Sequence, residues 1–127
     1  MTDFASFGLP ENILHTLAHL NFTTPTPIQQ QSIPVALEGK DILGSAQTGT
    51  GKTAAFAIPL VNHLLHSLAS TALVLLPTRE LAQQVLEATK GILGKTSKIK
   101  TALLIGGDSM PKQLQQLRHN PRIIVGT

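Results

Sequence analysis

The chain has 127 residues, of which 42% are hydrophobic and 13% are charged, a balance that allows a single domain with a buried core and excludes an intrinsically disordered chain. It contains no cysteine, which excludes disulfides and cysteine metal ligands. The net charge of +3 permits binding to nucleic acid, but the absence of Trp and Tyr excludes an extended aromatic platform for stacked bases.

No segment is typical of a membrane span or a secretory leader. The longest stretch rich in apolar residues, 54–69, is interrupted by Pro59, Asn62 and two histidines. The first residues have neither a basic region nor an apolar run after it. We therefore expect a cytoplasmic protein that makes no contact with membranes.

Two helices are predicted before residue 40. The first covers residues 10–20, with a proline in its first turn and apolar residues at helical spacing. A stiff turn with two prolines leads into a second helix over residues 27–37, which Pro34 would kink or shorten.

From residue 41 onward, short apolar runs alternate with longer amphipathic segments. This alternation predicts a parallel sheet with helices on both faces, so the expected fold class is α/β. The apolar faces expected to be buried are Leu81, Val85, Thr89 and Ile92 on one helix and Met110, Leu114 and Leu117 on another. The predicted strands are 42–46, 72–76, 101–105 and 123–125, and the predicted helices are 51–68, 79–93 and 110–119.

The most informative segment lies between the first predicted strand and its helix. Backbone N–H groups in a glycine-bearing turn at a helix N-terminus converge on one point, and the helix dipole favours an anion there. Lys52 adds positive charge for the outer phosphates, and the Thr53 hydroxyl can ligate Mg²⁺. The segment therefore predicts a loop that binds the phosphates of a nucleoside triphosphate; the alternative is an ordinary strand–helix turn. It reads Ala46-Gln47-Thr48-Gly49-Thr50-Gly51-Lys52-Thr53, with alanine where the general pattern has its first glycine.

Polar turns follow the three later strands as well. Ligands of open parallel sheets bind at the carboxyl ends of the strands, so we expect these turns and the phosphate loop to share one edge. A glycine pair allows close approach of a ligand, and Arg79 offers a planar donor fork for a phosphate or a carboxylate. The turns are Pro77-Thr78-Arg79-Glu80, Gly106-Gly107-Asp108 and Gly126-Thr127.

In order and spacing, these motifs resemble those of the DEAD-box ATP-dependent RNA helicases. Residues 25–29, with Phe22 and Phe4 upstream, look like the Q motif of that family, although Asn21 stands where the motif usually has glycine. Residues 46–53 are similar to its motif I, the Walker A or P-loop, in which alanine at the first position is normal. Three further segments resemble motif Ia, the GG motif and the start of motif Ib: residues 77–82, Gly106-Gly107 and residues 125–127.

The resemblance covers nearly the whole chain and implies its organisation. Residues 1–37 would be the Q-motif region, and residues 38–127 would be the first part of a RecA-like ATP-binding domain that stops within motif Ib. The chain would then be the N-terminal part of an ATP-dependent RNA helicase.

The resemblance also implies ATP and Mg²⁺ as cofactors. Gln29 would hydrogen-bond the adenine edge and select ATP over GTP, and Phe4 would stack on the base. Lys52 would contact the β- and γ-phosphates, and Thr53 would hold Mg²⁺; these two are the implied catalytic residues. On other interpretations, Phe4 and Phe22 cover the core and Gln29 is a solvated helix residue. The implied ATP-binding residues are Phe4, Gln29, Ala46, Gln47, Thr48, Gly49, Thr50, Gly51, Lys52 and Thr53.

RNA is the implied partner, held through sugar and phosphate rather than through base edges, which would position a strand without reading its sequence. Two alternatives stay open: Arg79 could be a surface charge or a partner of Glu80, and the glycine pair could be only a tight turn. The residues implied to line the RNA track are Pro77, Thr78, Arg79, Glu80, Gly106, Gly107 and Thr127.

The acidic residues that ATP hydrolysis needs are absent from this sequence. Hydrolysis in this class needs an acid after an apolar strand, and neither the Asp-Glu-Ala-Asp nor the Ser-Ala-Thr motif of the family occurs. Asp108 follows a strand but stands beyond two glycines, and His15 and His19, which could chelate a metal at their spacing, have no third ligand in view.

We therefore expect the chain alone to be inactive, and its incomplete sheet to favour self-association. Two competing hypotheses are another P-loop NTPase and a non-catalytic RNA-binding or interaction module.

Overall fold

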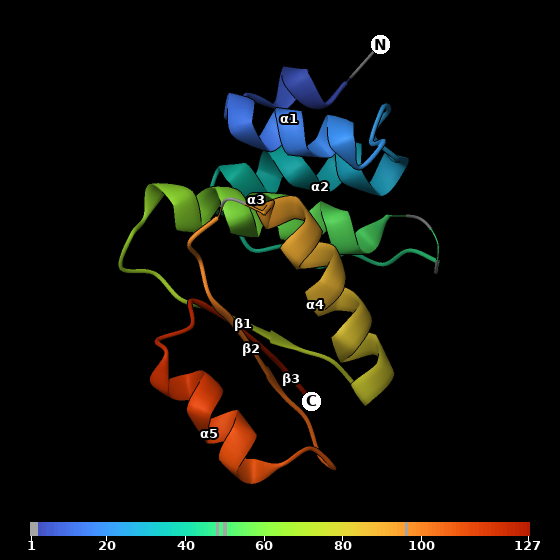
Figure 1. The fold of residues 1–127 in the computed structure, drawn as a ribbon. Coiled ribbons are helices and arrows are strands. Elements are labelled where there is room, and N and C mark those ends of the chain that lie inside the picture. The colour runs from blue at the N-terminus through green and yellow to red at the C-terminus, as the bar shows by residue number, and fades with distance from the viewer. Residues whose placement is uncertain (1–2, 48, 50, 96) are drawn as a thin grey trace.

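The helices and strands of the computed structural model follow the predicted order (Figure 1). The structure describes residues 3–47, 49, 51–95 and 97–127. A short 3-10 helix and three α-helices come first: η1 (Phe4–Phe7), α1 (Glu11–His19), α2 (Pro27–Leu37) and α3 (Lys52–His66). Strands and helices then alternate as β1 (Ala72–Leu75), α4 (Arg79–Leu93), β2 (Thr101–Leu104), α5 (Met110–Arg118) and β3 (Ile123–Gly126).

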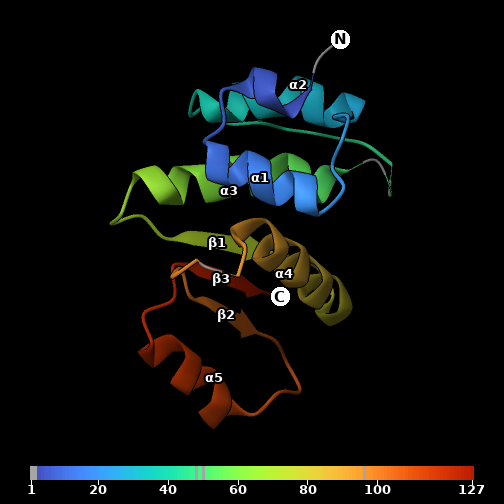
Figure 2. The ribbon, with the colours of Figure 1, turned by 45° about the horizontal axis from the view of Figure 1, so that its top comes forward.

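The three strands form one parallel sheet in the order β1-β3-β2. Leu75 of β1 and Leu104 of β2 are both in register with Gly126 of β3, so the three strands end at the same edge. Figure 2 shows the layers: α2 lies above α3, α1 lies across the front of α3, the sheet lies below them, and α5 lies on the far side of the sheet. This confirms the predicted α/β fold class with a parallel sheet.

Two apolar clusters form the core. The first joins the N-terminal helices to α3, and it includes Phe4, Ile13, Ile33 and Ile58. The second lies between the sheet and the two helices α3 and α4, around Leu64, Leu86 and Ile123. Since each element of the N-terminal flank contributes to the first cluster, the flank is fastened to α3, the helix that begins at the phosphate loop.

The predicted strand over residues 42–46 is not formed. Residues 41–47 have no regular secondary structure, and the side chains of Ile42 and Leu43 are 45% and 101% exposed. A strand needs a neighbour to accept and donate its backbone hydrogen bonds. Among the described residues no strand lies beside this segment, so its apolar pattern alone cannot produce a ladder.

The apolar face predicted for α4 is confirmed except at one residue, whereas the face predicted for α5 is wrong. In α4, Val85, Thr89 and Ile92 are buried as predicted, but Leu81 is 37% exposed. In α5 no residue is buried, and the three apolar side chains predicted to face a core are exposed. Helix α5 instead contacts β2 through two glutamines, so its position does not depend on an apolar face.

Those glutamines protect one edge of the sheet. Gln116 Oε1 accepts the backbone N–H of Leu103 at 2.9 Å, and Gln113 Nε2 donates to the Ile105 carbonyl at 2.8 Å. Within the part of the chain that the structure describes, no strand pairs with the free edge of β1, and Leu73 and Leu75 on this strand are 65% and 69% exposed. An uncovered strand edge is a template for pairing with another strand.

Arg122 ties the end of α3 to the start of β3. Its Nη2 donates to the carbonyls of Leu64 and Ser67 at 2.8 and 2.6 Å, and its Nε donates to the Ser70 carbonyl at 3.1 Å. Carbonyls at a helix C-terminus lack helical partners and carry partial negative charge, so a guanidinium is well matched to them. The sequence pattern gave no indication of this contact.

No described helix is long and apolar enough to cross a membrane. The prolines inside α2 and α3, Pro34 and Pro59, do not end those helices, so the expected shortening at Pro34 is wrong.

Candidate nucleotide site and RNA-facing edge

The segment predicted to bind phosphate leads directly into α3, as expected. Gly49 and Gly51 have φ values of 82° and 87°, the left-handed conformation that favours glycine. Helix α3 begins at Lys52, which is exposed, and Ala54 and Ala55 fasten its first turn to the core. Thr48 and Thr50 lie outside the described residues. The loop therefore has the turn and the helix N-terminus that a phosphate requires.

Gln29 connects the N-terminal flank to this loop. Its side chain is 2% exposed; Nε2 donates to the Gly51 carbonyl at 3.1 Å, and Oε1 accepts the Thr26 backbone N–H at 2.9 Å. The second bond caps the start of α2. Gln29 is therefore not a solvated helix residue: it joins two segments that are 22 residues apart.

Gly51 lies against the Gln29 amide so closely that no side chain fits between them. A Cβ atom at position 51 would collide with Gln29 Nε2 and would lie 2.9 Å from the Thr26 hydroxyl oxygen. That oxygen also faces the Gln29 backbone N–H in the capping box of α2. A glycine cradle that a Cβ atom would fill fits a ligand held close to the backbone of this loop.

Lys52 also lies on the wall of a hollow of about 620 Å³. The hollow is bounded by α2, residues 39–44, α3 and the start of β1, and its wall includes Asp41, Phe56 and Leu60. It opens beside the uncovered β1 edge, so the phosphate loop and the incomplete side of the sheet adjoin.

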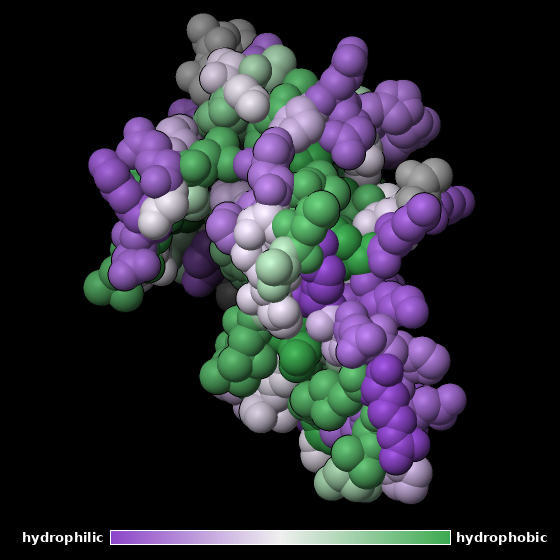
Figure 3. All heavy atoms as spheres, turned by 90° about the vertical axis from the view of Figure 1, so that its left-hand side faces the viewer, coloured by the Kyte–Doolittle hydropathy of each residue, from purple (hydrophilic) through white to green (hydrophobic). Residues whose placement is uncertain are grey.

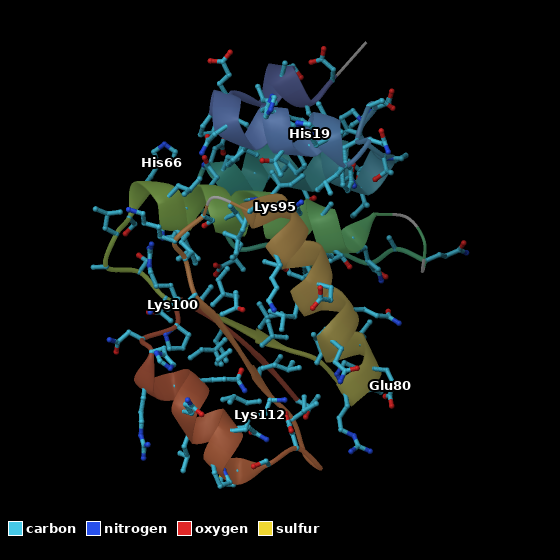
Figure 4. The ribbon with its side chains drawn as sticks, viewed as in Figure 1. His19, His66, Glu80, Lys95, Lys100 and Lys112 are labelled. Carbon is cyan, nitrogen blue, oxygen red and sulfur yellow. The ribbon has the colours of Figure 1, made fainter. Side chains whose placement is uncertain are left out.

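The turns after β1 and β2 meet, although 27 residues separate them. Arg79 Nη1 donates to the Gly106 carbonyl at 3.0 Å, and both residues line a shallow hollow of about 460 Å³ that also includes Lys112. Figure 4 shows Glu80 on α4 and Lys112 on α5 on either side of this edge. Arg79 is therefore not paired with Glu80 but bound to the glycine turn, and its other guanidinium N–H groups can serve a ligand.

The other residues predicted for this edge include Pro77, Thr78 and Thr127, which lie in the turns after β1 and β3. Thr78 caps α4 by accepting the Leu81 N–H at 3.2 Å, and Pro77 precedes it as an exposed residue. Thr127 follows β3 and donates its N–H to the Leu104 carbonyl at 3.3 Å. In Figure 1 the start of α4 and the end of β3 lie on the same side of the molecule as the loop before α3.

Asp108 is engaged by its neighbours. Its Oδ2 lies 3.6 Å from Lys112 Nζ, and its Oδ1 accepts the Ser109 N–H at 2.9 Å. No group of three potential metal ligands occurs among the described residues. The geometry therefore gives no support to Asp108 as a metal-binding acid.

A sequence profile of the DEAD/DEAH box helicases matches residues 26–127, which include the phosphate loop, the Gln29 contact and the turns after the three strands. The chain belongs to the DEAD/DEAH box helicase family. It is 44% identical over 124 residues to the DEAD-box ATP-dependent RNA helicase RhpA of Helicobacter pylori, covering 98% of this chain and 25% of that protein. It is 47% identical over 127 residues to the ATP-dependent rRNA helicase RRP3 of Eremothecium gossypii, covering 99% and 26%.

Solved structures of DEAD-box proteins share the fold. A DEAD box protein from Methanococcus jannaschii superimposes with a TM-score of 0.92 at 38% identity, covering 100% of this chain and 35% of that one. The RNA helicase Prp28 from Chaetomium thermophilum, bound to ADP, superimposes with a TM-score of 0.90 at 36% identity, and the match covers 100% of this chain and 32% of that one. The chain thus spans about a quarter of these curated relatives and about a third of these solved chains.

Phe4, which the DEAD-box resemblance places at the base, packs in the apolar core. The Phe4 ring is 4% exposed and packs edge-on against Phe7 and Phe22, with ring centroids 5.9 Å apart in both pairs. The alternative interpretation, that Phe4 and Phe22 cover the core, is confirmed. Stacking of Phe4 on a base stays a prediction, and it requires the ring to leave this cluster.

Two residues outside the predicted site residues also contact these segments. Thr26 lies beside Gly51 of the phosphate loop, and Gln113 donates to the Asp108 carbonyl at 3.4 Å in the turn after β2. The signal for Thr26 was available, since threonine before a proline-initiated helix with glutamine three residues later is a capping pattern. Nothing in the local pattern around Gln113 singles it out.

The glycine pair provides a test of the Arg79 contact. Gly107 has a φ of 82° and a Cβ there would collide with Arg79 Nη1, whereas a Cβ at Gly106 would meet no atom within 4 Å. We expect Gly107→Ala to lower the free energy of unfolding by about 1 kcal/mol, because alanine disfavours the left-handed region, and to displace Arg79. Urea denaturation measures this effect, with Gly106→Ala as the matched control. Equal effects from both substitutions would contradict the contact.

Proposed function

We propose that this chain is the part of an ATP-dependent RNA helicase that binds ATP and one side of the RNA backbone. The observation that carries the proposal is the hydrogen bond from Gln29 to the Gly51 carbonyl, which joins the Q-motif segment to the phosphate loop. The relatives are described as ATP-dependent RNA helicases, and one similar structure contains ADP. These findings support nucleotide binding at residues 46–53.

At this loop the roles follow from the donor set. The backbone N–H groups of residues 49–53 and the Lys52 ammonium would hold the phosphates, and the Thr53 hydroxyl would hold Mg²⁺. When bound, the metal would neutralise phosphate charge. Gln29 would transmit the presence of adenine to the loop, because its amide already holds Gly51.

RNA would lie across the turns after the three strands. The Arg79 guanidinium, the backbone of Gly106 and Gly107, and the Thr127 hydroxyl offer donors at one edge, and donors of this kind suit phosphate and sugar oxygens. The Gly106 carbonyl, held by Arg79, fixes the turn that a strand would cross. The edge supports sequence-independent contact.

ATP hydrolysis should be absent from this chain alone, because it has no acid placed to hold Mg²⁺ and orient water. Isothermal titration of the 127-residue chain should show that ATP binds more tightly than GTP. A coupled assay for phosphate release should show no turnover. ATP turnover by the unmodified chain that is lost in Lys52→Ala would contradict the proposal that this chain binds ATP without hydrolysing it.

The Gln29 contact has its own variant. Gln29→Glu keeps an acceptor for Thr26 N–H but replaces the donor to the Gly51 carbonyl with a carboxylate that repels it. We expect ATP affinity to fall about tenfold, a loss of about 1.4 kcal/mol. Gln31→Glu is the matched control, since Gln31 lies on the same helix and is exposed. Unchanged ATP affinity in Gln29→Glu would contradict the role of this bond.

The uncovered β1 edge should make the chain self-associate at high concentration. We expect Leu73→Lys together with Leu75→Lys to reduce association, because charged side chains on an edge strand oppose pairing. Sedimentation velocity over a concentration series measures this. Leu114→Lys on α5 is the control; if it reduces association equally, the β1 edge is not the contact.

A further inference from the structure

A hollow larger than the nucleotide-side hollow lies at the edge of the sheet where the strands begin. It has a volume of about 1060 Å³ and is bounded by α1, the end of α4, the loop before β2 and the end of α5. It shares no lining residue with the phosphate loop or with the turns at the RNA-facing edge. Nothing in the proposed function uses it.

The floor of this hollow is aliphatic. Leu20 is 41% exposed and lies over Gly91, where an added Cβ would be 3.7 Å from the leucine methyl groups. Leu93 and Ile99 are half-buried beside it and contact the core from below. An open aliphatic floor of this kind gains free energy when another apolar group covers it.

The rim of the hollow is cationic. Lys90, Lys95 and Lys100 line it together with three histidines, and no aspartate or glutamate is among its described lining residues. Neither Lys95 nor Lys100 lies within 4.0 Å of a carboxylate in the part of the chain that the structure describes. Figure 4 shows the labelled residues on separate segments: His19 on α1, Lys95 after α4 and Lys100 before β2.

The face at which the strands begin combines both properties. Figure 3 looks at that side of the molecule and shows apolar surface interspersed with hydrophilic side chains. On the α1 side of the hollow, the His15 and His19 rings pack edge-on, with their Nε2 atoms 3.2 Å apart. The site is therefore a groove with an aliphatic floor and a positively charged rim.

We propose that this groove docks an acidic, leucine-bearing segment of a partner protein. An amphipathic segment would lay its apolar side chains on Leu20, Leu93 and Ile99, and its carboxylates would face Lys95 and Lys100. This is the helix-in-groove mode of recognition, in which an apolar face supplies affinity and charge complementarity supplies selectivity.

A nucleic acid fits this groove less well. Phosphates would pair with the lysines, but bases would meet leucine and isoleucine rather than aromatic rings on which to stack. The family's RNA-facing edge lies at the opposite ends of the strands. The composition of the floor therefore favours a peptide over RNA.

The test is a binding titration of the 127-residue chain. The probe is a fluorescein-labelled peptide of about twelve residues, made of glutamate and leucine with the leucines on one helical face. We expect Lys95→Glu or Lys100→Glu to weaken its binding about tenfold, since each reverses a charge that faces the peptide. Lys40→Glu is the matched control: it reverses the charge of an exposed lysine that lines the nucleotide-side hollow and not this groove, so binding should change less than about twofold.

Two leucine substitutions test how much the aliphatic floor of the groove contributes to binding. Leu20→Gln should lower the affinity for the peptide about tenfold, whereas Leu68→Gln, at an exposed leucine outside the groove, should leave this affinity unchanged. Lys52→Ala should also bind the peptide normally, which separates this proposal from ATP binding. Three results would overturn the proposal: no binding of the acidic peptide, equal losses in Lys40→Glu and Lys100→Glu, or tighter binding of oligouridine that Lys95→Glu abolishes.

Discussion

Gly51→Ala is expected to remove most of the ATP affinity of this chain. The substitution forces alanine into the left-handed region, at a cost of about 1–2 kcal/mol, and its Cβ would collide with the Gln29 amide. The Gln29–Gly51 hydrogen bond and the backbone N–H groups of the loop would be displaced together. We expect ATP to bind at least about 30-fold more weakly, a loss of about 2 kcal/mol. Isothermal titration measures it.

Substitutions at two other glycines separate the effect of backbone strain from the effect of a collision with Gln29. Gly49 has a φ of 82° but open space around its Cα, so Gly49→Ala should show the strain alone. Gly44 has no positive φ, and a Cβ there would meet only ordinary contacts at 3.8 Å, so Gly44→Ala should leave ATP binding unchanged. The expected order of affinity loss is Gly51, then Gly49, then Gly44. A loss at Gly49 as large as at Gly51 would contradict the role given to Gln29.

Among substitutions of polar side chains outside the core, we expect Arg122→Met to cause the largest loss of stability. The guanidinium bonds three carbonyls, two of them at the end of α3, and methionine leaves these acceptors without their donor. We expect the free energy of unfolding to fall by about 3 kcal/mol, since bonds to charged groups contribute about 1.5–3 kcal/mol each and water replaces part of the loss.

Urea denaturation of Arg122→Met measures this loss, and two variants calibrate it. Arg118→Met removes the same type of side chain from an exposed position on α5 and should change stability by less than about 0.5 kcal/mol. Arg122→Lys should recover only part of the loss, because lysine has no planar fork to reach all three carbonyls. Full recovery with lysine would show that charge alone, rather than the fork, holds α3 to β3.

The sequence predicted most of this fold because its strongest signals are local. The β1, β2 and β3 strands and the helices between them lie within two residues of their predicted bounds. Hydrophobic periodicity, prolines in first turns and glycine-bearing turns are properties of a few neighbouring residues. The phosphate-loop motif is equally local, so its position before α3 was predictable.

The features that could not be predicted depend on distant residues. Residues 42–46 have the pattern of a strand, but whether they form one depends on a neighbouring strand, which a periodic pattern cannot reveal. Likewise, α5 has an apolar stripe, yet it reaches β2 through Gln113 and Gln116. The contact between Arg79 and Gly106 joins turns that only the sheet brings together.

The family resemblance implied roles for the site residues, and the structure shows how two of them are placed. Gln29 was expected to hydrogen-bond adenine; it is buried and bound to the Gly51 carbonyl of the phosphate loop. Phe4 was expected to stack on the base; its ring packs in the apolar core, and the stacking stays a prediction. In both cases the residue type was informative, whereas the direction of the side chain depended on packing with helices elsewhere in the chain.

The most direct test of the account is the site of nucleotide contact in solution. Amide chemical shifts of the ¹⁵N-labelled 127-residue chain, followed during titration with Mg²⁺–ATP, locate that contact residue by residue. The account predicts that the shifts gather at residues 46–53 and around Gln29, and that Lys52→Ala removes them. Shifts that survive in Lys52→Ala, or that gather at the edge where the strands begin, would contradict the assignment of the phosphate loop as the ATP site.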